Sequence, residues 1–316
     1  MTDTGGGHAT QLSGPDTSPA DTPAGTDTEH AETKAIIAAA FDNSADTYEQ
    51  VGVEFFAPLG AELVRRAAPQ PGEHVLDLGC GRGHCLFPAA EAVGSRGSVT
   101  GTDLSPRMVQ LCAAEAARRG LAHVHVELGD ASEPAFPAGN FDLITAGMVM
   151  FFVPEPRKAL PRVAALLRPG GRFAMSSFGP SDPKFDETMG ILYRHRIGPP
   201  WEDNPDKPFT THETITAMLA DSGFVDIEIT ELQHDIVFSD LDGYWAWVGS
   251  HGGRIMIDQV RPEHLPAARA DVYAMLSEHR EADGSLIHRS RAWFTTARRP
   301  PVTTHPGGKG TARVPA

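Results

Sequence analysis

The sequence predicts an α/β fold: a doubly wound, mostly parallel seven-stranded sheet with helical lid insertions. Between residues 73 and 299, short apolar runs typical of buried strands alternate with segments of helical periodicity. The glycine-rich stretch VLDLGCGRG, Val75–Gly83, stands between the first of these strands and a helix. Parallel sheets bind ligands at the carboxyl ends of their strands, so this loop predicts a site at that edge.

Turn and capping signals separate the predicted elements. Ser105 is an N-cap followed by Pro106 at the first helical position, and Gly120 stands past the end of that helix. Thr210 and Glu213 form a capping box for a helix that ends near Gly223. Strands are predicted at 74–78, 98–103, 123–128, 141–146, 172–178, from 225, and at 286–298, with further helices at 34–49, 58–68 and 156–167.

Charge and composition limit the function classes. The formal net charge of −14 disfavours nucleic-acid partners, which need a basic face. Apolar runs stay far below the roughly 18 residues that span a bilayer, and no secretory signal is visible, so we expect a cytoplasmic protein without membrane association. The three cysteines are expected to be reduced; a zinc site of Cys80, His84 and Cys85 would need a fourth ligand, so no metal is expected.

The glycine loop favours a cationic cofactor. Its glycines are Gly79, Gly81 and Gly83, and His84 occupies the position of the third glycine in the dinucleotide fingerprint. Asp77, two residues before the first glycine, is placed to face a cationic amino group rather than a pyrophosphate. An NAD(P)-dependent oxidoreductase remains a less favoured alternative.

These residues resemble the class I S-adenosylmethionine-dependent methyltransferases, whose first motif is an acidic residue followed by GxGxG. Asp103 at the end of the second strand resembles the ribose-binding acid of that family, and Gly129–Ala131 resembles its adenine-binding segment. FDLITAGMVMFFVPEPRKAL and LLRPGGRFAMSSFG are similar to the ubiquinone/menaquinone-biosynthesis type, so the resemblance covers residues 34–179. It implies S-adenosyl-L-methionine as cofactor, with these binding residues expected: Tyr48, Asp77, Gly79, Cys80, Gly81, Asp103, Leu104, Met108, Asp130, Ala131 and Ala146.

The resemblance and the composition together divide the chain. Residues 1–33 lack Lys, Arg and aromatic side chains and are expected to be a disordered tail, as is the flexible segment 300–316. Residues 34–72 are predicted to form N-terminal lid helices. Residues 73–299 form the predicted Rossmann-like methyltransferase domain, with lid insertions at 180–209 and 240–283.

The acceptor is expected to meet the cofactor beneath these lids. His195 and His251 are the candidate catalytic bases because histidine titrates near neutrality, whereas His84 is expected to cap a helix or touch the cofactor. No carboxylate follows the fourth strand at 147–152, which argues against metal-dependent methylation. The residues expected to bind the acceptor are Met148, Trp201, Tyr244 and Trp247.

The sequence thus predicts methyl transfer from S-adenosylmethionine to a small-molecule acceptor, in a specialised-metabolite pathway. Oxygen is the favoured acceptor atom, with carbon and nitrogen as alternatives. A protein that binds the same cofactor for a non-methylating reaction is a further alternative. A small-molecule substrate is the expected partner, and a homodimer is left open.

Overall fold

The protein is built on one seven-stranded sheet. The computed structural model describes residues 24–197 and 208–302, and its strand order is β3-β2-β1-β4-β5-β7-β6. The first five strands pair in parallel, and β7 runs antiparallel to both β5 and β6. This confirms the predicted fold class. The strands are β1 His74–Leu78, β2 Ser98–Asp103, β3 Val124–Leu128, β4 Phe141–Gly147, β5 Leu167–Phe178, β6 Val225–Phe238 and β7 Leu286–Arg298.

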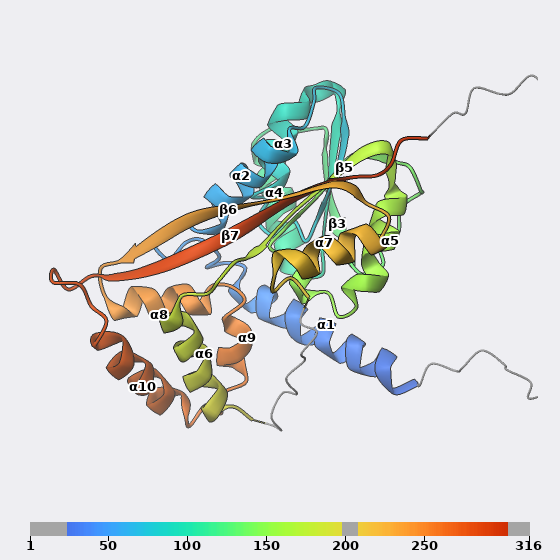
Figure 1. Cartoon of the computed structure of the whole chain (residues 1–316). Helices are drawn as coiled ribbons and strands as arrows, with labels where there is room; N and C mark the ends of the chain where they lie inside the picture. Colours follow the sequence, from blue (N-terminus) through green and yellow to red (C-terminus); the bar gives the residue numbers. More distant parts are fainter. Residues whose placement is uncertain (1–23, 198–207, 303–316) are drawn as a thin grey trace, which may run out of the picture.

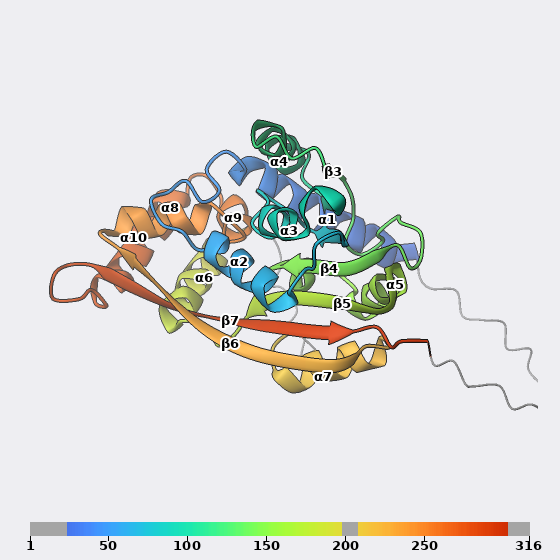
Figure 2. The ribbon, with the colours of Figure 1, turned by 90° about the horizontal axis from the view of Figure 1, so that it is seen from above.

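Helices cover both faces of the sheet (Figure 2). One apolar core joins the sheet to α2 Phe56–Ala67, α3 Leu86–Val93 and α4 Pro106–Arg118. The other joins it to α5 Pro156–Leu166 and α7 His212–Asp221. β1 and β4 lie between the two layers and are almost entirely buried, which explains their continuous apolar runs.

Further helices stand beside the outer half of the β6–β7 hairpin (Figure 1). They are α6 Pro183–His195, α8 Leu241–Gly249, α9 Arg254–Asp258 and α10 Leu265–Ser277. α10 packs on α6 and α8, and Tyr244 of α8 is completely buried with a hydrogen bond to Thr188 of α6 at 3.1 Å. These helices fall within the segments predicted as lid insertions, 180–209 and 240–283, of which residues 198–207 lie outside the described part of the chain.

Local signals explain most helix starts. Ser105 caps α4 by accepting from Met108 N, as predicted. The predicted capping box of Thr210 and Glu213 is wrong by one residue: Thr211 and Thr214 form it. Glu49 caps α2 from outside the helix, because its carboxylate accepts from the backbone N–H groups of Phe55, Phe56 and Ala57 at 2.6–2.9 Å.

The N-terminal helix is longer than predicted. α1 spans Ala24–Ser44, so the expectation of a disordered tail over residues 1–33 is wrong for 24–33. Part of the cause is long-range contact, since His30 Nδ1 lies 3.5 Å from Glu155 and Lys34 Nζ lies 2.7 Å from Asp130. Residues 1–23 and 303–316 lie outside the described residues.

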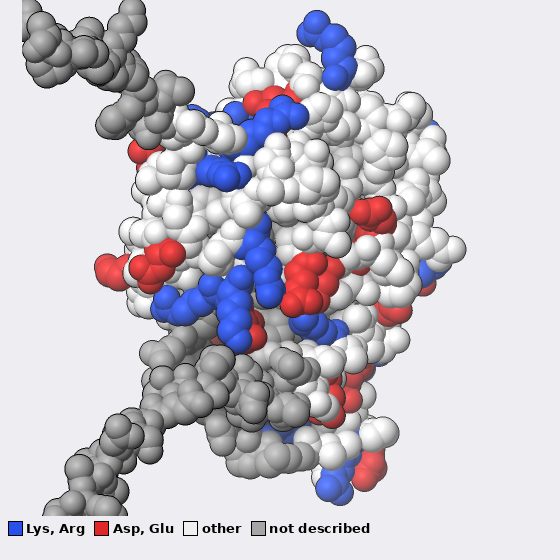
Figure 3. Space-filling view, turned by 90° about the vertical axis from the view of Figure 1, so that its right-hand side faces the viewer, with Lys and Arg blue, Asp and Glu red and all other residues white. Residues whose placement is uncertain are grey.

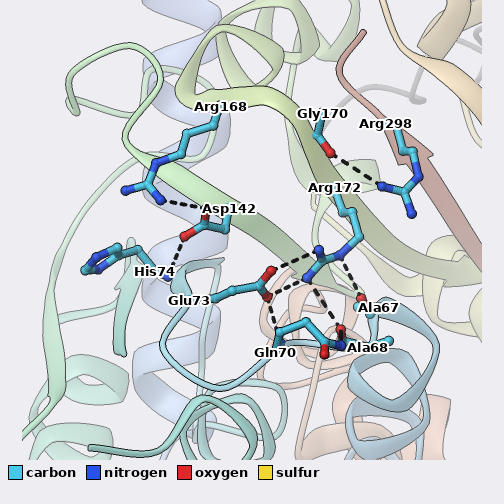
Figure 4. A network of polar contacts seen from close by, with 10 residues as sticks. All are labelled: Ala67, Ala68, Gln70, Glu73, His74, Asp142, Arg168, Gly170, Arg172 and Arg298. Atoms are coloured by element: carbon cyan, nitrogen blue, oxygen red, sulfur yellow. Dashed lines mark hydrogen bonds and ion pairs between the residues drawn. The ribbon is translucent and has the colours of Figure 1, made fainter. Parts of the chain in front are cut away.

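A polar network closes the edge of the sheet where β1 begins (Figure 4). The Arg172 guanidinium donates to both carboxylate oxygens of Glu73, at 3.0 and 2.5 Å. It also donates to the carbonyl oxygens of Ala67 and Ala68 at the end of α2, at 3.1 and 3.4 Å. Arg172 therefore ties β5 to the C-terminus of α2 and to the chain entering β1.

We expect Arg172→Met to lower the free energy of unfolding by about 2 kcal/mol, because it removes the charged donor of a half-buried carboxylate and a donor from each of two helix-end carbonyls. Thermal melting checks this. The control is Arg168→Met, whose side chain is 45% exposed and pairs with Asp142, and which should melt close to the wild type. Equal melting temperatures for the two variants would contradict the prediction.

Candidate active site

A cavity of about 290 Å³ opens at the carboxyl ends of the parallel strands. That volume is close to the lower end of the roughly 300–1,000 Å³ found for ligand pockets. Its inner wall comes from the segments that follow β1, β2, β3 and β4. These contribute Gly79 and Gly81, Asp103 and Leu104, Gly129, Asp130 and Ala131, and Gly147, Met148 and Val149.

The glycine loop brings backbone close to the cavity. Gly79 has φ +62°, and a Cβ there would stand 2.3 Å from Val149 Cγ2. Gly81 has φ +50°, and its N–H donates to Asp103 Oδ2 at 2.8 Å. Only glycine takes up these positions without strain or a clash. The loop after β1 is thereby fixed against the carboxylate at the end of β2.

Asp103 is a half-buried acid whose two carboxylate oxygens each accept a backbone hydrogen bond. Besides Gly81, Ser105 N donates to its Oδ1 at 2.9 Å. Burial raises the pKa of Asp103 in spite of these bonds. A ligand with hydroxyl groups in the cavity would replace lost water as a donor to this carboxylate.

Asp77 is the second acid and is fully buried. Thr145 Oγ1 donates to its Oδ1 at 2.8 Å, while Oδ2 has no hydrogen-bond partner among residues 24–197 and 208–302. Burial, aided by the charge of Asp103, raises the pKa of Asp77 to about 7. Asp77 lines a smaller adjoining cavity together with Tyr48 and Cys80. An unpaired buried carboxylate oxygen calls for a donor, and a cationic amine fits best.

Helix α1 lies across the cavity and supplies residues that the sequence analysis did not place there. Lys34 pairs with Asp130, and Phe41 meets the Phe152 ring edge-on with centroids 5.5 Å apart. At its other end, Asp42 accepts from Ser105 Oγ and, at 3.0 Å, from Arg107 N. Nothing in the local sequence links Lys34 to Asp130, so only the fold could reveal this pair.

Aromatic side chains form a further wall of the main cavity. It is formed by Phe56, Phe151, Phe152, Phe178 and Phe185 together with Met189 and His251. Tyr48 lines both cavities and stacks on Phe56 with centroids 5.2 Å apart. Phe178 and Phe185 escaped prediction because single apolar residues at a strand end and in a helix carry no signal of their own.

The cavity brings together most of the predicted cofactor residues. Ala146 is an exception, since it is buried in the core between β4 and α5. Leu104, Met108, Asp130 and Ala131 line the main cavity, and Cys80 lines the smaller one.

Only some of the residues predicted to bind the acceptor or to act in catalysis lie at a cavity. Met148 and His251 line the main cavity, and Trp247 lines a neighbouring one. His195 is not brought to the site: its Nε2 lies 3.0 Å from Asp271 Oδ2 on α10. Tyr244 is core between α6 and α8. Trp201 lies outside the described residues.

Over 24–197 and 208–302, no group of three or more His, Cys, Asp or Glu is placed to hold a metal ion. In the same part of the chain, no helix has both the length and the apolar character needed to cross a membrane.

Two strand-end carboxylates thus flank a glycine loop at the candidate site. A methyltransferase domain model matches residues 69–207. The chain is 37% identical over 280 residues to nocamycin O-methyltransferase of Saccharothrix syringae, covering 83% of this chain and 98% of that protein. It is 48% identical over 144 residues to aklanonic acid methyltransferase DauC of Streptomyces sp. (strain C5), covering 46% and 66%.

The chain therefore belongs to the methyltransferase family, and the predicted resemblance and enzyme class are confirmed. Among solved structures, the YcgJ protein of Bacillus subtilis has the same fold, with a TM-score of 0.53, 21% identity, and coverage of 76% of this chain and 98% of that one.

Asp103→Ala should weaken binding of S-adenosylhomocysteine at least about tenfold, because hydrogen bonds to a charged group contribute roughly 1.5–3 kcal/mol. Isothermal titration calorimetry measures this. Asp46→Ala is the matched control, since Asp46 pairs with Arg107 at 2.6 Å and its side chain is 66% exposed. An unchanged dissociation constant in the Asp103 variant would remove this carboxylate from the site.

Helix α1 should exchange its amide hydrogens more slowly when S-adenosylhomocysteine is bound. It is held over the cavity largely by polar contacts and leaves Ile36 49% exposed, so a ligand beneath it adds contacts that the free protein lacks. Hydrogen exchange with mass spectrometry compares residues 34–44 with α7, which packs on the other face and should not change. Equal exchange of α1 in both states would show a fixed wall.

Proposed function

We propose that the protein transfers the methyl group of S-adenosylmethionine to an oxygen atom of a small, largely apolar metabolite. One observation carries the proposal: a glycine loop lies between the buried Asp77, which lines the smaller cavity, and the half-buried Asp103, which lines the main cavity beside the aromatic wall. The buried, unpartnered Asp77 Oδ2 fits the amino group of this cofactor, and Asp103 fits its ribose hydroxyls. When bound, the cofactor supplies a methyl group on a positively charged sulfur.

The chain's own residues would position and dehydrate the reactants. Asp103 would accept from the ribose hydroxyls. The segment Asp130–Ala131 with Leu104 and Met108 would enclose the adenine, since all four line the main cavity. Tyr48 lies at the methionine end, where burial raises its pKa far above the usual value and keeps its hydroxyl neutral. Excluding water from this region strengthens every charge interaction within it.

The acceptor is inferred from the aromatic wall and from the relatives. Five phenylalanines and Met189 suit an apolar, ring-containing molecule. The two relatives are named for methylation of nocamycin and aklanonic acid, and one is named as an O-methyltransferase. We therefore infer an O-methylation in specialised metabolism.

The charge of the protein does not favour a nucleic acid as the methyl acceptor. The net charge is −14, and cations at the surface have acidic neighbours. Arg162 lies 3.2 Å from Glu133, and Lys158 lies 2.6 Å from Glu155. Figure 3 shows the face on the right-hand side of Figure 1, where Lys and Arg side chains stand beside Asp and Glu side chains. Such a surface offers little to a phosphate backbone.

The proposal is tested by incubating the purified protein with methyl-labelled S-adenosylmethionine and candidate acceptors. Aklanonic acid and a demethylated nocamycin are the first choices. Mass spectrometry should find labelled methyl on an acceptor oxygen together with S-adenosylhomocysteine. Label on carbon or nitrogen would overturn O-methylation. A tightly bound cofactor with product formed but no label transferred would indicate a non-methylating reaction.

Asp77 predicts a pH dependence of cofactor binding. Its pKa of about 7 means that the free protein carries a protonated Asp77 in weakly acidic solution, whereas pairing with a cationic amine requires the carboxylate. The affinity for S-adenosylmethionine should therefore rise with pH by up to about tenfold per unit between pH 5 and 7, then level off. Calorimetry at several pH values checks this. Asp77→Asn should bind weakly with a flat profile; an equally steep profile in that variant would assign the proton elsewhere.

A further inference from the structure

A second cavity of about 160 Å³ adjoins the cofactor cavity. Phe178, Phe185 and His251 line both cavities and so form the boundary between them. The far side is formed by Trp247 of α8, Asp182 at the start of α6, and His288 of β7. A molecule in this second cavity would reach the cofactor past His251.

His251 is buried, with 4% of its surface exposed, and its two ring nitrogens differ. Gly253 N donates to Nδ1 at 3.3 Å, so Nδ1 is an acceptor and carries no hydrogen. A neutral imidazole with an acceptor at Nδ1 has its hydrogen on Nε2. That Nε2 is buried and has no hydrogen-bond partner within the described part of the chain. His251 therefore presents an unused donor.

Trp247 supplies a second unused donor. Its ring lies 4.5 Å from that of His251, centroid to centroid. Its Nε1 is also buried, and none of the described residues accepts a hydrogen bond from it. An indole N–H can only donate. Two neighbouring unsatisfied donors cost free energy unless a ligand accepts from them.

The acidic group of this cavity is already engaged. Asp182 accepts from Arg289 N at 2.7 Å and from Lys184 N at 2.9 Å, and Lys184 Nζ lies 3.0 Å from it. These donors lower the pKa of Asp182. Its carboxylate is thus a fixed part of the wall rather than a free proton acceptor.

We propose that the second cavity holds the acceptor, and that His251 and Trp247 donate hydrogen bonds to an acceptor oxygen that is already ionised on arrival. His251 is on this view a positioning residue and not the base that the sequence suggested. The inference rests on the proposed function. The acceptor class is an apolar molecule with an acidic oxygen group, such as a carboxylic acid or the enol of a 1,3-dicarbonyl.

The reaction then needs no base. A lone pair of the ionised oxygen forms the bond to the methyl carbon, while the bond from that carbon to the sulfonium sulfur breaks and its electrons remain on sulfur. The negative charge of the acceptor and the positive charge of the cofactor cancel, and no proton is released. In a group with two oxygens, the donors hold one oxygen and the other attacks.

The tautomer of His251 can be measured on the wild-type protein. Long-range ¹H–¹⁵N NMR of ¹⁵N-histidine-labelled protein, assigned with His251→Gln, should show hydrogen on Nε2 and no titration from pH 6 to 9. Burial, with a smaller contribution from His288, lowers the pKa of His251 to about 3. A signal with hydrogen on Nδ1, or a titration in this range, would overturn the donor role.

Binding of 2-naphthoate to protein saturated with S-adenosylhomocysteine tests the cavity. Its alcohol analogue 2-naphthalenemethanol has the same ring without the charge and should bind at least about tenfold more weakly. His251→Phe and Trp247→Phe should each weaken naphthoate at least about tenfold, and His251→Gln, which keeps a donor, should restore most of that loss. Melting curves identify any variant that fails to fold.

The outcomes separate the two proposals. Failure of S-adenosylhomocysteine to bind would refute the proposed function. Normal cofactor binding with equal affinity for naphthoate and its alcohol, or with no naphthoate binding, would refute the acceptor site alone.

Discussion

The pairing of β1 with β2 is the constraint on which the site depends. Their parallel register places Asp77 opposite Gly101, and β2 then ends two residues later at Asp103. Both carboxylates therefore reach the same edge, with the glycine loop between them and Gly81 N bound to Asp103. Gly101 has no side chain because a Cβ there would meet Leu86 and Cys80. A slip of this register would separate the acids and turn Asp77 out of the site.

Placing the buried Asp77 beside the half-buried Asp103 has an electrostatic consequence. The charge of Asp103 adds to burial in raising the pKa of Asp77, which has one oxygen unpaired. Such an arrangement destabilises the ionised form until a cation arrives, so it favours a positively charged ligand over a phosphate. Lys34 of α1 does not neutralise this pair, since it is engaged with Asp130.

The parts of the fold that were predicted from sequence depend on local signals. β1, β2 and β7 have the predicted bounds, and Ser105 caps α4, because periodicity and capping are encoded within a few residues. The start of α1 was missed because it depends on contacts with residues about a hundred positions away. The site follows the same rule. The motif residues lie together at the cavity, as local signals predicted. His195 instead pairs with Asp271, and the aromatic wall is assembled from elements far apart in the sequence.

The two ends of the site have opposite polarity. The cofactor end presents the acceptor-only groups Asp77 and Asp103, while the proposed acceptor end presents unpaired donors on His251 and Trp247. An anionic acceptor entering the free protein would face the two carboxylates across the shared wall. Besides the two neutral donors, Arg291 lines the second cavity, and its guanidinium lies 3.9 Å from Glu231. A bound sulfonium reverses that field, since its charge then attracts the same anion. The arrangement therefore favours acceptor binding after the cofactor, with α1 and the aromatic wall keeping water away from both charges.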